Sequence, residues 1–111
     1  MARVLTFDVE EQRLTKNKDC DFKHIIAGTK GYLVCQFNLG YGWEGCTVAA
    51  SFWNDGVEYP VLLDEFGCCD IPEEAVTGRK FHVSLTGLIK GTVSDYRIVT
   101  NKVKITQGVV R

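Results

Sequence analysis

The alternation of apolar and polar residues over much of the chain is the feature that most limits what it can fold into. In residues 81–87, Phe81, Val83 and Leu85 fall on one side, with more polar residues between them. Successive side chains of a β-strand point to opposite faces, so such a segment buries one face and wets the other. The same pattern predicts strands over residues 4–9, 32–39, 47–53, 57–63 and 96–105.

Shorter segments and turn signals complete the predicted fold. Residues 22–27 read as a short strand, and residues 13–16 as a continuation of the first strand or a second short one. Asp55-Gly56 is a strong hairpin signal, because these residues tolerate the positive φ of tight turns. Pro60 lacks an N–H and predicts an edge strand, and residues 72–76 are the one plausible helical turn. About eight strands at this spacing predict an all-β, two-sheet antiparallel sandwich that is immunoglobulin-like.

The shared phase of the alternation also predicts the core. A chain of 111 residues is expected to form a single β-sandwich domain over residues 1–111. Residues 33–39 are expected to point Leu33, Cys35, Phe37 and Leu39 inward. The predicted core consists of Leu5, Phe7, Leu33, Cys35, Phe37, Val48, Phe52, Phe81, Val83, Leu85, Val103 and Ile105.

Charge and hydropathy exclude several classes of partner. The net charge is -1, so there is no basic excess to attract phosphates, and we expect no nucleic-acid partner. Apolar runs are far shorter than a bilayer span, so we expect no membrane association. The first residues read as a strand rather than a signal peptide, which predicts a protein made in the cytoplasm with five free thiols.

No pattern in the chain predicts catalysis or a cofactor. The five cysteines contain no Cys-x-x-Cys pair, and His24 and His82 have no metal-ligand spacing to them, which argues against zinc. The acidic residues between 64 and 74 form no ordered calcium loop and read as a solvated face. A thiol enzyme would need a cysteine activated by one of the histidines, and we rank this hypothesis last. We therefore expect a protein that is not an enzyme and has no cofactor or metal.

Three large aromatic residues are the candidate binding residues. Tyr41 and Trp43 lie in a glycine-rich connection, and Trp53 falls on the outward phase of its strand. Exposed aromatics act as anchors at protein interfaces or as platforms for sugar rings. Trp43 has a second interpretation, in which it folds back over one end of the core. If the three aromatics line one exposed strip, a carbohydrate-binding module is favoured over other binding proteins.

Several short motifs, taken in order, resemble a known family. They are residues 5–15 (LTFDVEEQRLT), 43–45 (WEG), 59–64 (YPVLLD), 69–74 (CDIPEE), 81–87 (FHVSLTG) and 98–101 (IVTN). Together they are similar to a small β-sandwich domain of virion proteins of tailed bacteriophages of Gram-positive hosts. The resemblance is to the amino-terminal domain of baseplate upper proteins and of tail or head fibre proteins, and it covers nearly the whole chain.

The resemblance implies a non-enzymatic assembly role. It implies a bacteriophage structural protein located in the virion, with other virion proteins as partners and with several copies on a symmetric particle, or a homo-oligomer. The sequence ends directly after the last predicted strand, so we expect a stand-alone adaptor or decoration domain rather than a fibre anchor. Tail or baseplate is the first expected location. The alternatives are capsid decoration or head-fibre anchoring, and a carbohydrate-binding module that recognises host surface glycans through Tyr41, Trp43 and Trp53.

Overall fold

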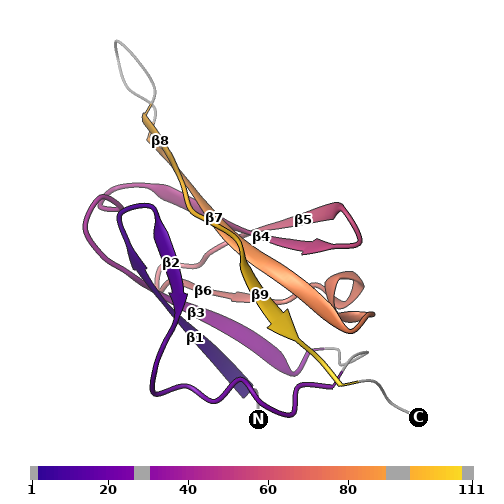
Figure 1. The fold of residues 1–111 in the computed structure, drawn as a ribbon. Helices are drawn as coiled ribbons and strands as arrows, with labels where there is room; N and C mark the ends of the chain where they lie inside the picture. Colours follow the sequence, from indigo (N-terminus) through magenta and orange to yellow (C-terminus); the bar gives the residue numbers. More distant parts are fainter. Residues whose placement is uncertain (1–2, 27–30, 90–95, 109–111) are drawn as a thin grey trace.

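A computed structural model describes residues 3–26, 31–89 and 96–108 (Figure 1). The chain forms two packed β-sheets, as the alternation predicts. Its elements are β1 (Arg3–Glu10), β2 (Arg13–Lys16), β3 (Leu33–Leu39), β4 (Thr47–Asn54), β5 (Val57–Leu62), β6 (Cys68–Asp70), the 3-10 turn η1 (Glu73–Val76), β7 (Lys80–Ile89), β8 (Tyr96–Val99) and β9 (Val103–Thr106).

The smaller sheet has the strand order β2-β1-β3-β6, and the larger has the order β5-β4-β7-β8, with β9 also paired to β7. Strands β1 and β3 run parallel, and the other named strand pairs are antiparallel. The first strand thus pairs with the third strand as well as with its neighbour in sequence. The architecture is the predicted two-sheet sandwich, with one parallel pair within it.

The core lies between the two sheets and matches the predicted phase. Of the predicted core residues, all but Val103 are buried, and Val103 is partly buried against the others. The rings of Phe7 and Phe37 stack with centroids 5.2 Å apart inside the smaller sheet. Leu39 is a correction: it is 37% exposed, at the end of β3 and beyond Gln36, the last residue of that strand that pairs with β6.

One predicted turn and one predicted edge strand form as expected. Asp55 (φ 52) and Gly56 (φ 79) make the tight hairpin between β4 and β5. Strand β5 lies at the edge of its sheet. Leu63 donates its N–H to the Val48 carbonyl, and hydrogen-bonded positions alternate along an antiparallel pair of strands. Pro60 lies three residues before Leu63, so it and its register partner Ser51 occupy a position without ladder hydrogen bonds. Its nitrogen therefore faces away from β4, so the missing N–H costs no ladder hydrogen bond and blunts the open edge.

The structure corrects two predicted strands. Residues 22–26 form no strand beyond an isolated bridge between Ile26 and Gly108, and Ala27 lies outside the described residues. Arg3 reaches into this segment instead, and its guanidinium donates to the carbonyls of Asp21 and Lys23. The predicted strand over residues 96–105 is two strands, β8 and β9.

The break between β8 and β9 is a β-bulge opposite Leu85. The β7–β8 pairing continues to Thr100, whose N–H donates to the Leu85 carbonyl (3.0 Å), while the Leu85 N–H donates to Thr100 Oγ1 (2.9 Å). The β7–β9 pairing, which includes Val83 with Val103, is displaced by one residue relative to this register. Two residues, Thr100 and Asn101, therefore oppose one, which is the definition of a bulge.

Asn101 fastens the two sheets along one side. Its amide accepts a hydrogen bond from Leu14 N (2.8 Å) and donates one to Leu14 O (3.1 Å). Leu14 belongs to β2 in the smaller sheet, whereas Asn101 leads into β9 of the larger. The side chain thus occupies the place that a neighbouring strand would have on β2.

Candidate functional site: a cationic face around Trp53

Trp53 lies near the end of β4 and points to the outer face of the larger sheet. In the strand register it sits in one row with Glu58 of β5, His82 of β7 and Lys104 of β9. The row crosses four strands, because each of these residues occupies an outward-facing position. Segments distant in sequence therefore combine on one surface.

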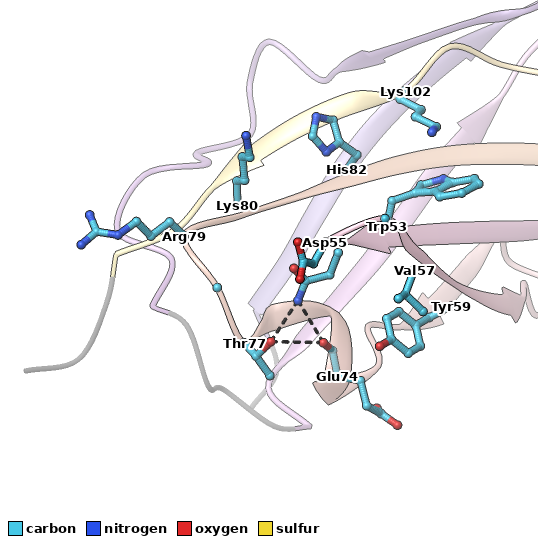
Figure 2. Close-up of a pocket in the computed structure, with 13 residues that line it drawn as sticks. Trp53, Asp55, Val57, Tyr59, Glu74, Thr77, Arg79, Lys80, His82 and Lys102 are labelled. Carbon is cyan, nitrogen blue, oxygen red and sulfur yellow. Dashed lines mark hydrogen bonds between the residues drawn. The ribbon is translucent and has the colours of Figure 1, made fainter.

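The indole of Trp53 is half-buried and held on both sides. Its Nε1–H donates to Ser84 Oγ (3.0 Å) on the neighbouring strand, and the Nζ of Lys102 lies 3.7 Å from the ring centroid. Figure 2 shows the Lys102 ammonium next to the indole. Ser84 points outward yet is only 5% exposed, which is consistent with cover by the indole. A cation over an aromatic face gains about 0.5–2 kcal/mol, so the ring holds Lys102 in place.

Positive charge dominates this face. Lys80, Lys102 and Lys104 surround His82, and Figure 2 shows Lys80, His82 and Lys102 on the same side of the sheet as Trp53. Partial burial lowers the pKa of His82, and the three lysines lower it further. Among the described strand positions on the outer face of the larger sheet, Glu58 is the one acid, and its carboxylate accepts a hydrogen bond from Ser51.

The bulge puts Lys102, which precedes β9, and Lys104, which lies within it, on this face. In β8, Ile98 pairs with Gly87 and points into the core, so even-numbered residues face inward there. After the bulge, Ile105 pairs with Phe81 and is buried, so odd-numbered residues face inward. Lys102 and Lys104 would point into the core if the alternation continued unchanged from β8.

The hollow beside Trp53 has a volume of about 1020 Å³ and extends around the β4–β5 hairpin. Its other wall is fixed by Asn54, whose amide donates to the Glu74 carbonyl (3.1 Å) and to Thr77 Oγ1 (2.9 Å), as Figure 2 shows. These bonds tie the hairpin to η1. The side of the hollow formed by the hairpin and η1 is therefore held by hydrogen bonds.

Trp43 is a core residue, which corrects its prediction as an interface residue. It is 3% exposed, and its Nε1–H donates to the Glu11 carbonyl (2.7 Å). A Cβ on Gly87 would lie 2.8 Å from the Trp43 ring, so the ring fills the space that this glycine leaves in β7. The indole thus connects the β1–β2 turn of one sheet with β7 of the other.

Tyr41 is 69% exposed and shares a hollow with Tyr96 and Arg97, which pair with Ile89 and Leu88 at the other end of β7 from His82, the partner of Trp53. Tyr96 Oη donates to the Gly42 carbonyl (3.1 Å). Tyr41 precedes the start of β4, and Trp53 is near its end, about 20 Å further along a strand of this length. The three aromatics therefore do not line one exposed strip.

Phe66 is the most exposed large apolar side chain in the described part of the chain, at 74%, and the alternation of the sequence does not predict its exposure. It projects from the turn between β5 and β6, where Asp64 Oδ1 accepts from the N–H groups of Phe66 and Cys68 (both 2.9 Å). Gly67 takes φ 78 in this turn, and a Cβ there would lie 2.8 Å from the Phe37 carbonyl. Leu62, 68% exposed, lies four residues before it. The Asp-x-x-Gly spacing signals the turn but not the outward direction of Phe66.

The cysteines are free thiols in the structure. Burial raises the pKa of Cys35 strongly and that of Cys69 to about 12, which disfavours the thiolate needed for nucleophilic chemistry. In the described part of the chain, no group of three His, Cys, Asp or Glu side chains is arranged to hold a metal ion. No helix in that part is long and apolar enough to cross a membrane.

Comparison with family models, with curated proteins and with solved structures finds no match to this chain. The bacteriophage resemblance remains a prediction from the sequence motifs.

Proposed function

We propose that this chain is a structural protein of a bacteriophage particle that binds other virion proteins as an adaptor or decoration domain. It acts without catalysis or a cofactor. The tail or baseplate is its first location, with capsid decoration or head-fibre anchoring as alternatives. The resemblance of the sequence to virion proteins supports a place in the particle. The exposed Phe66 in the β5–β6 turn supports the binding of a partner protein.

The exposure of Phe66 is the observation on which the proposed binding role depends. An aromatic side chain that is 74% exposed on a hydrogen-bonded turn presents a large apolar surface with little loss of freedom on binding. Leu62, the last residue of β5 and 68% exposed, is a second exposed apolar side chain four residues before Phe66. Aromatic anchors of this kind carry much of the binding energy of protein interfaces.

The size of the domain favours several copies. One standard interface buries about 800 Å² per partner. Attachment becomes stable when neighbouring subunits of a symmetric particle add further contacts. We therefore expect the protein in many copies per particle.

The carbohydrate-binding alternative has less support. Trp43 is buried, and Lys102 occupies the face of Trp53 on which a sugar ring would stack. Tyr41 remains exposed, but it lies far from Trp53 along β4. A lone tyrosine is a smaller platform than the strip that a glycan chain requires.

The test is mass spectrometry of purified phage particles that encode this chain, followed by the same measurement for Phe66→Ser. We expect many copies in the wild-type particle and at least about a tenfold loss in the variant, as for removal of an interface anchor. Tyr32→Ser, at a residue 48% exposed before β3, is the matched control and should be retained. Absence of the wild-type protein from the particle would refute the proposal, and full retention of Phe66→Ser would remove Phe66 from the interface.

A further inference from the structure

We infer that the outer face of the larger sheet docks an acidic, extended segment of a partner protein, whose carboxylates contact Lys102, Lys104 and Lys80. The inference rests on the proposed function, because it takes the partner to be another protein of the same particle. It concerns a different surface from the turn that carries Phe66.

The spacing of the lysines matches an extended chain. Lys102 and Lys104 are two residues apart on one face of the β9 segment, which corresponds to about 7 Å. Lys80, on the adjacent strand, is the register partner of Thr106 and continues the positive charge in the same direction. An extended peptide with acids at alternate positions repeats at this interval on one side.

The charge of the face is preorganised, and it is balanced only in part by Asp55 and Glu74, which line the same hollow but lie outside the strands of the sheet. Trp53 holds Lys102 by its ring, and Ser84 holds the indole in turn. Glu58, the one acid among the described outward strand positions of the larger sheet, accepts a hydrogen bond from Ser51 and lies on β5, which β4 and β7 separate from β9. Complementary charge from a partner would steer association and fix its register.

The geometry favours an acidic protein over a nucleic acid. Proteins that bind single-stranded nucleic acid use free aromatic faces on which bases stack. Here the exposed face of Trp53 is covered by Lys102, and the indole N–H is already bonded to Ser84.

The experiment measures fluorescence anisotropy of a short labelled peptide in which glutamate alternates with serine. Titration with the full chain should show saturable binding that weakens as salt rises. The double variant Lys102→Gln/Lys104→Gln should weaken binding at least about tenfold, as expected for the loss of two complementary charges. The matched control, Lys18→Gln/Lys23→Gln, removes the same charge from two exposed lysines in the connection after β2 and should bind as the wild type does. Circular dichroism of each variant establishes that it is folded.

Four results would overturn the inference. They are the absence of saturable binding, equal affinity in the Lys102→Gln/Lys104→Gln variant, an equal loss in both double variants, and tighter binding of a single-stranded oligonucleotide than of the peptide. The last would assign the face to a polyanion. None of these results bears on whether the protein is present in the particle. Peptide binding therefore tests this inference, and mass spectrometry of particles tests the proposed function separately.

Discussion

Individual residues show how far alternation in a sequence determines burial. Leu5, Phe37 and Leu85 could be assigned to the core because each lies in mid-strand, where one phase faces the second sheet. Leu39 has the same phase but lies at the end of its strand, where phase no longer determines cover. Trp43 could not be placed, because loop residues have no alternation and its burial depends on the space left by Gly87.

The contrast between Phe37 and Leu39 gives a prediction at this scale. Phe37→Ala should lower the free energy of unfolding by about 3–5 kcal/mol, because it leaves a cavity beside Phe7 that the packed sheet cannot fill. Leu39→Ala, two residues further along the same strand, should cost less than about 1 kcal/mol. Urea denaturation of both variants measures the difference. Similar losses would contradict the inward assignment of Phe37 and the exposure of Leu39.

At the scale of elements, the bulge explains why the cationic face was missed. The segment 96–105 was interpreted as one strand, although Ile98 and Ile105 have opposite parity and cannot share a face of a regular strand. That change of parity, with Asn101 between the two parts, was the available signal. Lys80 lies on β7, whereas Lys102 and Lys104 lie just before β9 and within it, so only the pairing of β7 with β9 brings the three lysines together.

Asn101 provides the prediction for this element. Asn101→Ala removes two hydrogen bonds and leaves the N–H and carbonyl of Leu14 without their partner, which should cost about 1–3 kcal/mol. Gln12→Ala is the control, because it removes one exposed hydrogen bond, to the Val99 carbonyl, which water can replace. We expect it to cost less than about 1 kcal/mol. Equal losses in thermal denaturation would show that Asn101 does not fasten the sheets.

For the whole molecule, the sequence was sufficient for the architecture but not for the pairing of strands. Two sheets follow from many short alternating segments, since each must bury one face. The parallel pairing of β1 with β3 could not be predicted, because adjacency of strands distant in sequence depends on the assembled fold. The same limit applies to the binding surfaces: Tyr41 and Trp53 were found by position and phase, whereas Phe66 and the three lysines required the structure.

The two sheets should unfold together, because Trp43 and Asn101 each connect one sheet to the other. In the Trp53→Phe variant, Trp43 is the remaining tryptophan and reports on the contact between the sheets. Its fluorescence and the far-UV circular dichroism should change at the same urea concentration, as two-state unfolding requires. A fluorescence transition at lower urea than the dichroism transition would mean that the sheets separate first.

The bulge between β8 and β9 has a consequence for inheritance. Substitutions at Lys102 or Lys104 alter only the charge of a surface, so a lineage can vary these positions while the fold persists. The loss of the codon for Asn101 would turn the junction into a regular ladder in which Val103 and Ile105 keep their partners Val83 and Phe81, but it would remove the side chain that holds Leu14 of the other sheet. In related genes, we therefore expect the residue at position 101 to vary less than the identity of the lysines.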